Sequence, residues 1–331
     1  EQNYRSTQKI LDAAFAVISK NTGHPILKLW TNNPAGQPIQ LYEAQNEKNE
    51  AEFVLQTIQQ SNNETMKQFN NYAILYRTNA QSRVFEEALL HAGIPYLLVG
   101  GVRFYERKEI KDVLSYLRLL ANPKDTVSYK RIEKLGKGRL NKFLNFVSKD
   151  QSRDTTLELL DQVLKKTGYL DLFDKENPED LMRLENIKEL RSVATQFPDL
   201  TEFLENVSLV EKESLNRSRP TTPTAHNPSP SGAVTLMTLH SAKGLEFPVV
   251  FLVGMEEGLF PHSRSLMDKN ELEEERRLCY VGITRAKQQV YLTYARRRLF
   301  FGQHSSNMIS RFIEEIPAEL LESVWQTESF A

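Results

Sequence analysis

Residues 234–253 read Val-Thr-Leu-Met-Thr-Leu-His-Ser-Ala-Lys-Gly-Leu-Glu-Phe-Pro-Val-Val-Phe-Leu-Val, and this stretch decides the fold. Apolar residues alternate from Val234, a Lys-Gly turn follows, and a continuous apolar run spans residues 249–253. Alternation predicts a strand, and a short apolar run is typical of a strand buried on both faces. We therefore expect two strands of a parallel sheet, with His240 to Glu246 lining its carboxyl edge, where α/β folds bind ligands.

Strand and helix patterns alternate in the first hundred residues. Helical spacing of apolar residues runs from Ile10 to Ile18. The patterns that follow predict an extended segment at 39–42, a helix at 47–60, a buried strand at 72–76, a helix at 80–91 and a short strand at 96–99. Such alternation is typical of parallel βαβ units.

The middle of the chain has a different pattern. After Gly100-Gly101 the apolar spacing is helical until about Val210, and residues 216–232 then hold four prolines among Ser, Thr and Asn. A charged helix at about 270–287 and a strand at 290–294 restore α/β character near the end. The expected organisation is an α/β domain in two parts, 1–103 and 233–331, interrupted by a helical subdomain at 104–215 and a flexible linker at 216–232.

Composition sets limits on the class of protein. A chain of 331 residues suffices for about two domains, and 40% hydrophobic with 26% charged residues is an ordinary globular balance. The single cysteine, Cys279, excludes an intramolecular disulfide framework and a cysteine-rich metal site, which fits the cytoplasm. A net charge of −1 gives no overall attraction to nucleic acid, so Arg296-Arg297-Arg298 forms either a local basic track or a solvated surface.

Two further runs support a family resemblance. Tyr280-Val281-Gly282-Ile283-Thr284-Arg285-Ala286 lies about forty residues after the first run, and the chain opens with Glu1-Gln2-Asn3-Tyr4-Arg5-Ser6. With residues 238–247, these runs resemble the sixth, fourth and fifth motifs of superfamily 1 DNA helicases of the UvrD, PcrA and Rep type. The resemblance implies a RecA-like, P-loop NTPase-type parallel sheet domain (2A) interrupted by a mainly helical subdomain (2B).

One half of an ATPase site is missing from the sequence. There is no glycine-rich loop ending in Gly-Lys-Ser or Gly-Lys-Thr, and no Asp-Glu pair follows an apolar strand. We therefore expect the C-terminal half of an ATP-dependent 3′–5′ DNA helicase, inactive alone. Its partner is then the N-terminal RecA-like half of the same protein, which would hold most of the Mg²⁺ contacts; no metal ligand is assigned here.

The resemblance also assigns nucleotide contacts. Arg5 and Arg285 would reach the γ-phosphate of ATP, because guanidinium forks suit the charge of a phosphoryl transition state. Tyr4 would face the adenine, Glu246 would accept a hydrogen bond from a ribose hydroxyl, and Gly244 is a further nucleotide-binding residue. The alternatives are an ion pair of Arg285 with a glutamate of residues 273–275, a half-buried aromatic for Tyr4, and a helix-start carboxylate for Glu246.

The expected DNA contacts come from two strand ends and one aromatic. The resemblance places Arg77, Thr78, Asn79, Thr238 and His240 against the backbone of single-stranded DNA. Phe301, after the triple arginine, is placed like a base-stacking aromatic, with ordinary core packing as the alternative. The expected DNA partners are single strands and single-strand/double-strand junctions.

Three alternatives remain open from the residues alone. Gly136-Lys137-Gly138-Arg139 opens a predicted helix and would meet a duplex phosphate, or forms a plain turn. For the whole chain, the two alternatives to half of a helicase are a non-catalytic module that binds DNA or a protein partner, and part of a RecB-type helicase-nuclease.

Overall fold

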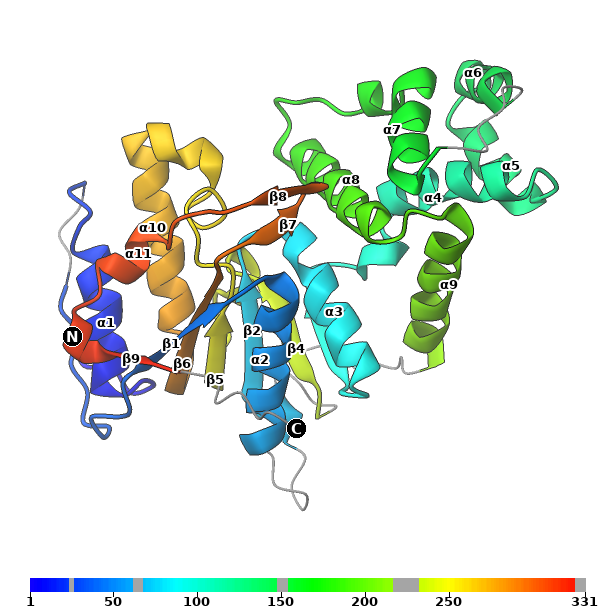
Figure 1. The fold of residues 1–331 in the computed structure, drawn as a ribbon. Coiled ribbons are helices and arrows are strands. Elements are labelled where there is room, and N and C mark those ends of the chain that lie inside the picture. The colour runs from blue at the N-terminus through cyan, green and yellow to red at the C-terminus, as the bar shows by residue number, and fades with distance from the viewer. Residues whose placement is uncertain (24–26, 62–67, 148–153, 217–231, 325–331) are drawn as a thin grey trace. The chain divides into compact units, whose positions relative to one another are not determined.

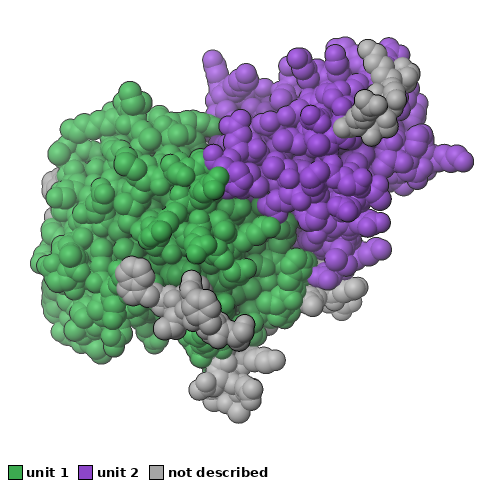
Figure 2. Space-filling model, in the orientation of Figure 1, with its two compact units in different colours: residues 1–101, 219–298, 305–331 green, residues 102–218, 299–304 purple. Residues whose placement is uncertain are grey.

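The computed structural model describes residues 1–23, 27–61, 68–147, 154–216 and 232–324. The chain divides into two compact units, coloured separately in Figure 2. Unit 1 comprises residues 1–101, 219–298 and 305–331, and unit 2 comprises residues 102–218 and 299–304. The linker expected at 216–232 lies, apart from its two end residues, outside the described residues.

Unit 1 is built on a parallel sheet. Within the described residues, seven strands follow the order β3-β4-β2-β5-β6-β1-β9, and every neighbouring pair is parallel (Figure 1). The strands are β1 (Ile39–Ala44), β2 (Tyr72–Tyr76), β3 (Tyr96–Val99), β4 (Val234–Thr238), β5 (Phe247–Leu252), β6 (Ala286–Ala295) and β9 (Leu321–Ser323). The parallel α/β sheet predicted from the alternating patterns is confirmed, and so is the RecA-like fold class that the family resemblance implied.

Helices cover both faces of this sheet. One face packs against α1 (Gln8–Ile18), α10 (Lys269–Ile283) and the short α11 (Arg311–Glu314), and the other against α2 (Glu47–Ser61) and α3 (Ser82–His91). Strand β2 shows why: Ala73 and Leu75 belong to the first core, and Tyr72, Ile74 and Tyr76 to the second. Successive side chains point to opposite faces, so a strand that is buried on both must be apolar throughout.

Unit 2 is mainly helical. Its helices are α4 (Lys108–Ala121), α5 (Thr126–Lys134), α6 (Lys137–Val147), α7 (Thr156–Thr167), α8 (Pro178–Gln196) and α9 (Leu200–Asn216). Asp125 caps α5 by accepting hydrogen bonds from two backbone amides, and Thr155 forms a capping box with Glu158 at α7. The strands β7 (Arg298–Phe300) and β8 (Gln303–Ser305) form a separate two-stranded sheet. No helix of the described ranges is both long and apolar enough to cross a bilayer.

The boundary between α10 and β6 corrects one prediction. The charged helix was expected to continue to Lys287, but it ends at Ile283, and Lys287 is the second residue of β6. The backbone shows the reason: Phe247 N–H donates to the Arg285 carbonyl, and Ser6 Oγ donates to the Ala286 carbonyl. These carbonyls are thereby taken by partners distant in sequence instead of by a further helical turn.

The position of Arg298 also differs from what the sequence suggested. The sequence left it open as part of a basic surface track, but its side chain is 7% exposed and lies between Glu256 and Glu50. Its Nη2 is 2.6 Å from Glu256 Oε1 and 2.7 Å from Glu50 Oε2. Burial alone would lower the pKa of Arg298, but the two carboxylates raise it well above its usual value. Arg298 is therefore a structural cation at the carboxyl edge of the sheet.

Replacing Arg298 by methionine should strongly destabilise unit 1. The change leaves two buried carboxylates without their cation, which costs about 3–5 kcal/mol in comparable cases. The matched control is Arg296→Met, because Arg296 pairs with Glu43 at 2.8 Å while its own side chain is 69% exposed. Urea titration followed by circular dichroism should show a clearly lower midpoint for Arg298→Met and an unchanged one for Arg296→Met. Equal midpoints for the two variants would refute a structural role for the buried pair.

Candidate functional site

The predicted site residues of unit 1 lie at two opposite edges of the sheet. Strands β4 and β5 are both parallel to β2, which lies between them, so the connection 239–246 must run from the carboxyl end of β4 to the amino end of β5. His240 follows the end of β4, and Glu246 immediately precedes β5. The prediction that His240 to Glu246 line a single carboxyl edge is therefore wrong for Gly244 and Glu246.

At the amino edge, Glu246 is held by two cations. Arg5 Nε lies 2.6 Å from Glu246 Oε2, and Lys287 Nζ lies 2.7 Å from Glu246 Oε1. The hydrogen bonds from Lys287 and then from Arg5 lower the pKa of the Glu246 carboxyl. Glu246 precedes a strand and not a helix, so its interpretation as a helix-start carboxylate is wrong.

Arg285 lies beside this cluster with neutral partners only. Its guanidinium donates to the carbonyl oxygens of Val281 and Leu245 and to Thr284 Oγ1, at 3.0, 3.2 and 3.3 Å. Arg5 Nη1 donates to the Thr284 carbonyl at 3.3 Å, so the two arginines meet at one residue. Burial lowers the pKa of Arg285, and the positive charge of Arg5 lowers it further.

The ion pair considered for Arg285 from sequence does not form. Glu273 accepts hydrogen bonds from Thr22, Glu274 pairs with Arg277, and Glu275 pairs with Arg77. In the part of the chain that the structure describes, Arg285 has no acidic partner. Arg285 is therefore a partly buried cation held in place by dipoles, with its charge available to an anion.

Two glycines allow this local geometry. A Cβ on Gly282 would lie 2.5 Å from Leu239 Cδ2 and 3.0 Å from Leu252 Cδ2, so glycine lets α10 approach the sheet closely just before Arg285. Gly244 has φ +88°, in the left-handed region that glycine adopts without strain, and it precedes Glu246 by two residues. Both glycines serve backbone placement next to the charged cluster.

Tyr4 is open to solvent at the start of the same cluster. Its side chain is 80% exposed, and its hydroxyl donates to Gln2 Oε1 at 2.9 Å. The half-buried interpretation of Tyr4 is therefore wrong. The aromatic ring is accessible to a planar ligand, whereas Arg5 next to it is ordered by Asn3, whose side-chain oxygen accepts from the Arg5 amide.

At the carboxyl edge, Arg77 follows β2 and is already paired. Its Nε and Nη2 both lie within 3.0 Å of Glu275 carboxylate oxygens, and the Glu275 side chain is only 4% exposed. The backbone amides of Arg77 and Thr78 donate to Gln81 Oε1, which orders the turn before α3. Thr78 is buried and Asn79 is partly exposed. The Arg77 side chain can reach a phosphate only by sharing or leaving Glu275.

Thr238 and His240 lie at the neighbouring strand end. Thr238 Oγ1 is 3.0 Å from Ser241 Oγ and accepts from the Ser241 amide at 3.3 Å. His240 is exposed at its tip. Partial desolvation lowers the pKa of His240 and Arg77 lowers it further, whereas Glu275 opposes the shift. The sheet thus brings Arg77 and His240 together, as two adjacent parallel strand ends should.

Phe301 belongs to unit 2 instead of the sheet edge. Its ring centroid is 5.0 Å from Lys188 Nζ, its φ is +57°, and Gly302 N–H donates to Ser192 Oγ at 3.0 Å. Within the same unit, residues 137–147 form α6 as predicted, and Arg139 donates to the Leu135 and Gly168 carbonyls.

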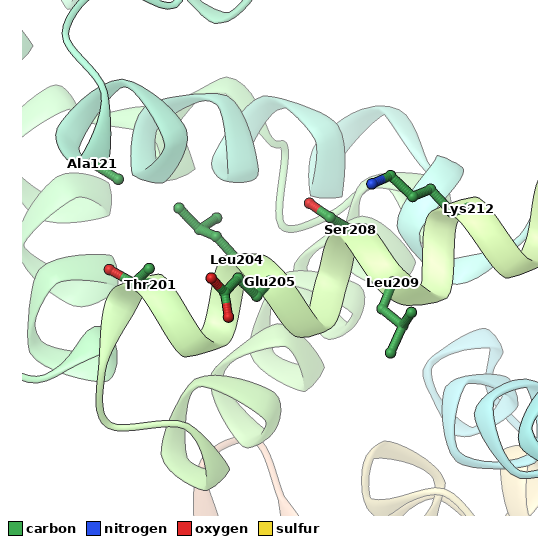
Figure 3. A pocket seen from close by; sticks show the side chains of 7 residues that line it. All are labelled: Ala121, Thr201, Leu204, Glu205, Ser208, Leu209 and Lys212. Carbon is green, nitrogen blue, oxygen red and sulfur yellow. The ribbon is translucent and has the colours of Figure 1, made fainter.

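Metal-binding clusters and the cavity in unit 2 add no further candidate site among the described residues. A cavity of about 340 Å³ lies next to α9, and none of the predicted site residues lines it; Figure 3 shows the side chains that do. Across the described ranges, no group of three or more His, Cys, Asp or Glu side chains could hold a metal ion. The charged amino edge and the Arg77–His240 edge remain the candidates.

Comparisons with known proteins agree with the motifs. The family model of the UvrD-like helicase C-terminal domain matches residues 1–176 and 155–297. The ATP-dependent DNA helicase PcrA of Bacillus subtilis is 43% identical over 374 residues, covering 98% of this chain and 50% of the relative. PcrA of Staphylococcus aureus strain COL is 43% identical over 370 residues with the same coverage. The chain therefore spans about half the length of the curated relatives it matches.

Solved structures also match this chain. One of them is a C-terminal domain of a possible DNA helicase from a Lactobacillus, with a TM-score of 0.42, 12% identity, and coverage of 97% of this chain and 98% of that one. Similarity at that level adds nothing to the family match.

The electrostatic environment of His240 can be tested by titration. Because its folded pKa lies below the unfolded value of 6.5, its contribution to stability is present above that pH and is lost as pH falls through the folded pKa. Arg77→Gln removes a nearby positive charge and releases the charge of Glu275, so the pKa of His240 should rise. NMR titration, with the His240 resonance assigned by its loss in His240→Ala, measures the shift. Arg118→Gln, which breaks an ion pair with Glu211 in unit 2, is the control; an unmoved or lowered His240 pKa in Arg77→Gln would contradict the assignment.

Proposed function

The chain belongs to the family of UvrD-like helicase C-terminal domains, and from this membership we propose that it is the C-terminal half of an ATP-dependent 3′–5′ DNA helicase. In the intact parent protein it would complete a composite ATPase site with the N-terminal RecA-like half. That half would supply the Gly-Lys-Thr loop, the Asp-Glu pair and most of the Mg²⁺ contacts. We further propose a cytoplasmic location, and single strands and single-strand/double-strand junctions as the DNA partners.

The observation that supports this proposal most directly is that the Arg285 guanidinium has only neutral hydrogen-bond partners. A buried cation is normally paired, since removing it from water is costly. Arg285 instead keeps only carbonyl and hydroxyl partners, next to a second guanidinium, at the amino edge of the sheet. Such an arrangement suits an anion that arrives from outside this chain, and the γ-phosphate of ATP has the required charge and geometry.

The proposed chemistry follows from where charge develops. In phosphoryl transfer the transferred group spreads negative charge over its equatorial oxygens, and positioned cations stabilise it. Arg285 and Arg5 would play this role, Glu246 and Gly244 would lie beside the ribose, and the exposed ring of Tyr4 would meet the adenine. The chain alone, without a phosphate-binding loop in its sequence, would not hydrolyse ATP.

The opposite edge of the sheet is the proposed track for single-stranded DNA. Arg77, Thr78, Asn79, Thr238 and His240 lie at the ends of β2 and β4, and all of them except the buried Thr78 present polar side-chain groups that suit a phosphodiester backbone. Because one eight-residue connection joins the two edges, residues 239–246 would transmit closure at the ATP site to the DNA track.

Arg285→Ala in the intact parent should abolish useful ATP hydrolysis. Arginine contacts of this kind contribute about 10³- to 10⁵-fold to turnover, so Arg285→Ala and Arg5→Ala should each lower kcat by orders of magnitude. Steady-state hydrolysis with saturating single-stranded DNA measures this. Arg183→Ala, which removes an exposed arginine paired with Asp180 in unit 2, is the matched control and should retain activity. An active Arg285→Ala parent would sink the proposal and favour a non-catalytic module.

His240→Ala should weaken single-stranded DNA binding without abolishing it. Loss of one hydrogen bond of typical strength corresponds to about a two- to tenfold loss of affinity. Fluorescence anisotropy of the intact parent with a labelled oligonucleotide, at one fixed salt concentration, measures it. His91→Ala is the matched control, because His91 is an exposed histidine that ends α3, near the amino edge. Equal affinities for the two variants would contradict a DNA contact at His240.

A further inference from the structure

Lys287 is a charged residue of the amino edge to which no motif assigned a role. It is the second residue of β6, and Arg285 lies in the turn just before that strand. Its carbonyl accepts a hydrogen bond from the Thr7 amide at 3.2 Å, which ties this strand to the segment that carries Arg5. Its ammonium is 2.7 Å from Glu246 Oε1, and the two side chains are 40% and 37% exposed.

Arg5 has two competing uses in this arrangement. Its Nε is 2.6 Å from Glu246 Oε2 and its Nη1 reaches the Thr284 carbonyl, so the carboxylate holds the same guanidinium that the proposed function requires at a phosphate. If Arg5 turns toward a polyphosphate, Glu246 loses one of its two cations. An uncompensated carboxylate beside a polyphosphate would repel it, and the repulsion would weaken nucleotide binding.

Building on the proposed function, we propose that Lys287 is a positioning residue that keeps Glu246 neutralised when Arg5 transfers to the nucleotide phosphate. Each oxygen of Glu246 holds one cation, so Arg5 can leave Oε2 while Lys287 remains on Oε1. The role needs no contact between Lys287 and the nucleotide. The hydrogen bond from Lys287 is also the largest cause of the lowered pKa of Glu246, ahead of the bond from Arg5.

The role of Lys287 could not be predicted from the sequence, because the residues before it have a helical pattern. Lys287 was expected to end the charged helix, where a lysine would be an ordinary solvated cation near a helix carboxyl terminus. In the structure α10 stops at Ile283, and the turn through Thr284 and Arg285 places Lys287 in a strand opposite Glu246, 41 positions away in the sequence.

A double-mutant cycle in the intact parent tests the inference. Lys287→Met removes the charge at similar length, and the KM for ATP should rise about two- to fivefold, the scale of one partly exposed ion pair, with a smaller change in kcat. Glu246→Gln removes the charge that Lys287 neutralises. In the Glu246→Gln background, the further change Lys287→Met should therefore leave KM unchanged. Lys287→Arg should restore the wild-type KM, and the effect of Lys287→Met should shrink as salt rises.

The outcomes separate this inference from the proposed function. Lys20→Met removes an exposed lysine at the end of α1 and should leave KM unchanged. If Lys287→Met raises KM by the same factor in both backgrounds, Lys287 contacts the nucleotide directly and the inference is overturned. An unchanged KM in Lys287→Met, with hydrolysis still dependent on Arg285, overturns the inference alone. An active Arg285→Ala parent overturns both.

Discussion

The site depends on one topological constraint: β4 and β5 are parallel and lie on either side of β2. A connection between them must return across the full height of the sheet. At about 3.3 Å per residue of strand, that height is a substantial part of the length that an extended eight-residue segment can span. Residues 239–246 therefore have little slack. The first half of this segment is held at the edge that carries Arg77, and the second half at the edge that carries Arg285. A movement of the backbone at one edge must therefore move the segment at the other edge as well.

Charge pairing distinguishes Arg298 from Arg285. Arg298 is buried and Arg285 is partly buried, but Arg298 pairs with two buried carboxylates, whereas Arg285 forms no ion pair among the described residues. A fold selected for stability alone would pair or remove a buried guanidinium, because desolvation without a partner is costly. In a chain with a net charge of −1 and many glutamates, the lack of an ion-pair partner at Arg285 supports the proposed site better than the overall charge does.

The sequence predicted what depends on local pattern and missed what depends on distant contacts. The strands at 72–76 and 96–99 appear in the structure with the same bounds, because continuous apolar or β-branched runs specify buried strands directly. The end of α10, the partners of Glu246 and the burial of Arg298 depend on groups between 38 and 280 positions away. A residue such as Lys287 has the same chemistry in a solvated helix end or in a strand, so only the register of β6 against β5 reveals its partner.

Unit 2 has its own anchoring helix, and this bears on the role of Phe301. The segment at 102–107 is fastened to α8 by Arg107 Nη1, 2.7 Å from Asn186 Oδ1. The segment at 299–304 is fastened to the same helix through Gly302 and Ser192, where a Cβ on Gly302 would lie 3.1 Å from the Arg191 Cβ. Phe301 takes its orientation from α8 and Lys188, not from a strand of the main sheet. If Phe301 stacks on a base, as one of the two sequence interpretations has it, that contact would couple single-stranded DNA to unit 2, whereas a contact at His240 would couple it to unit 1.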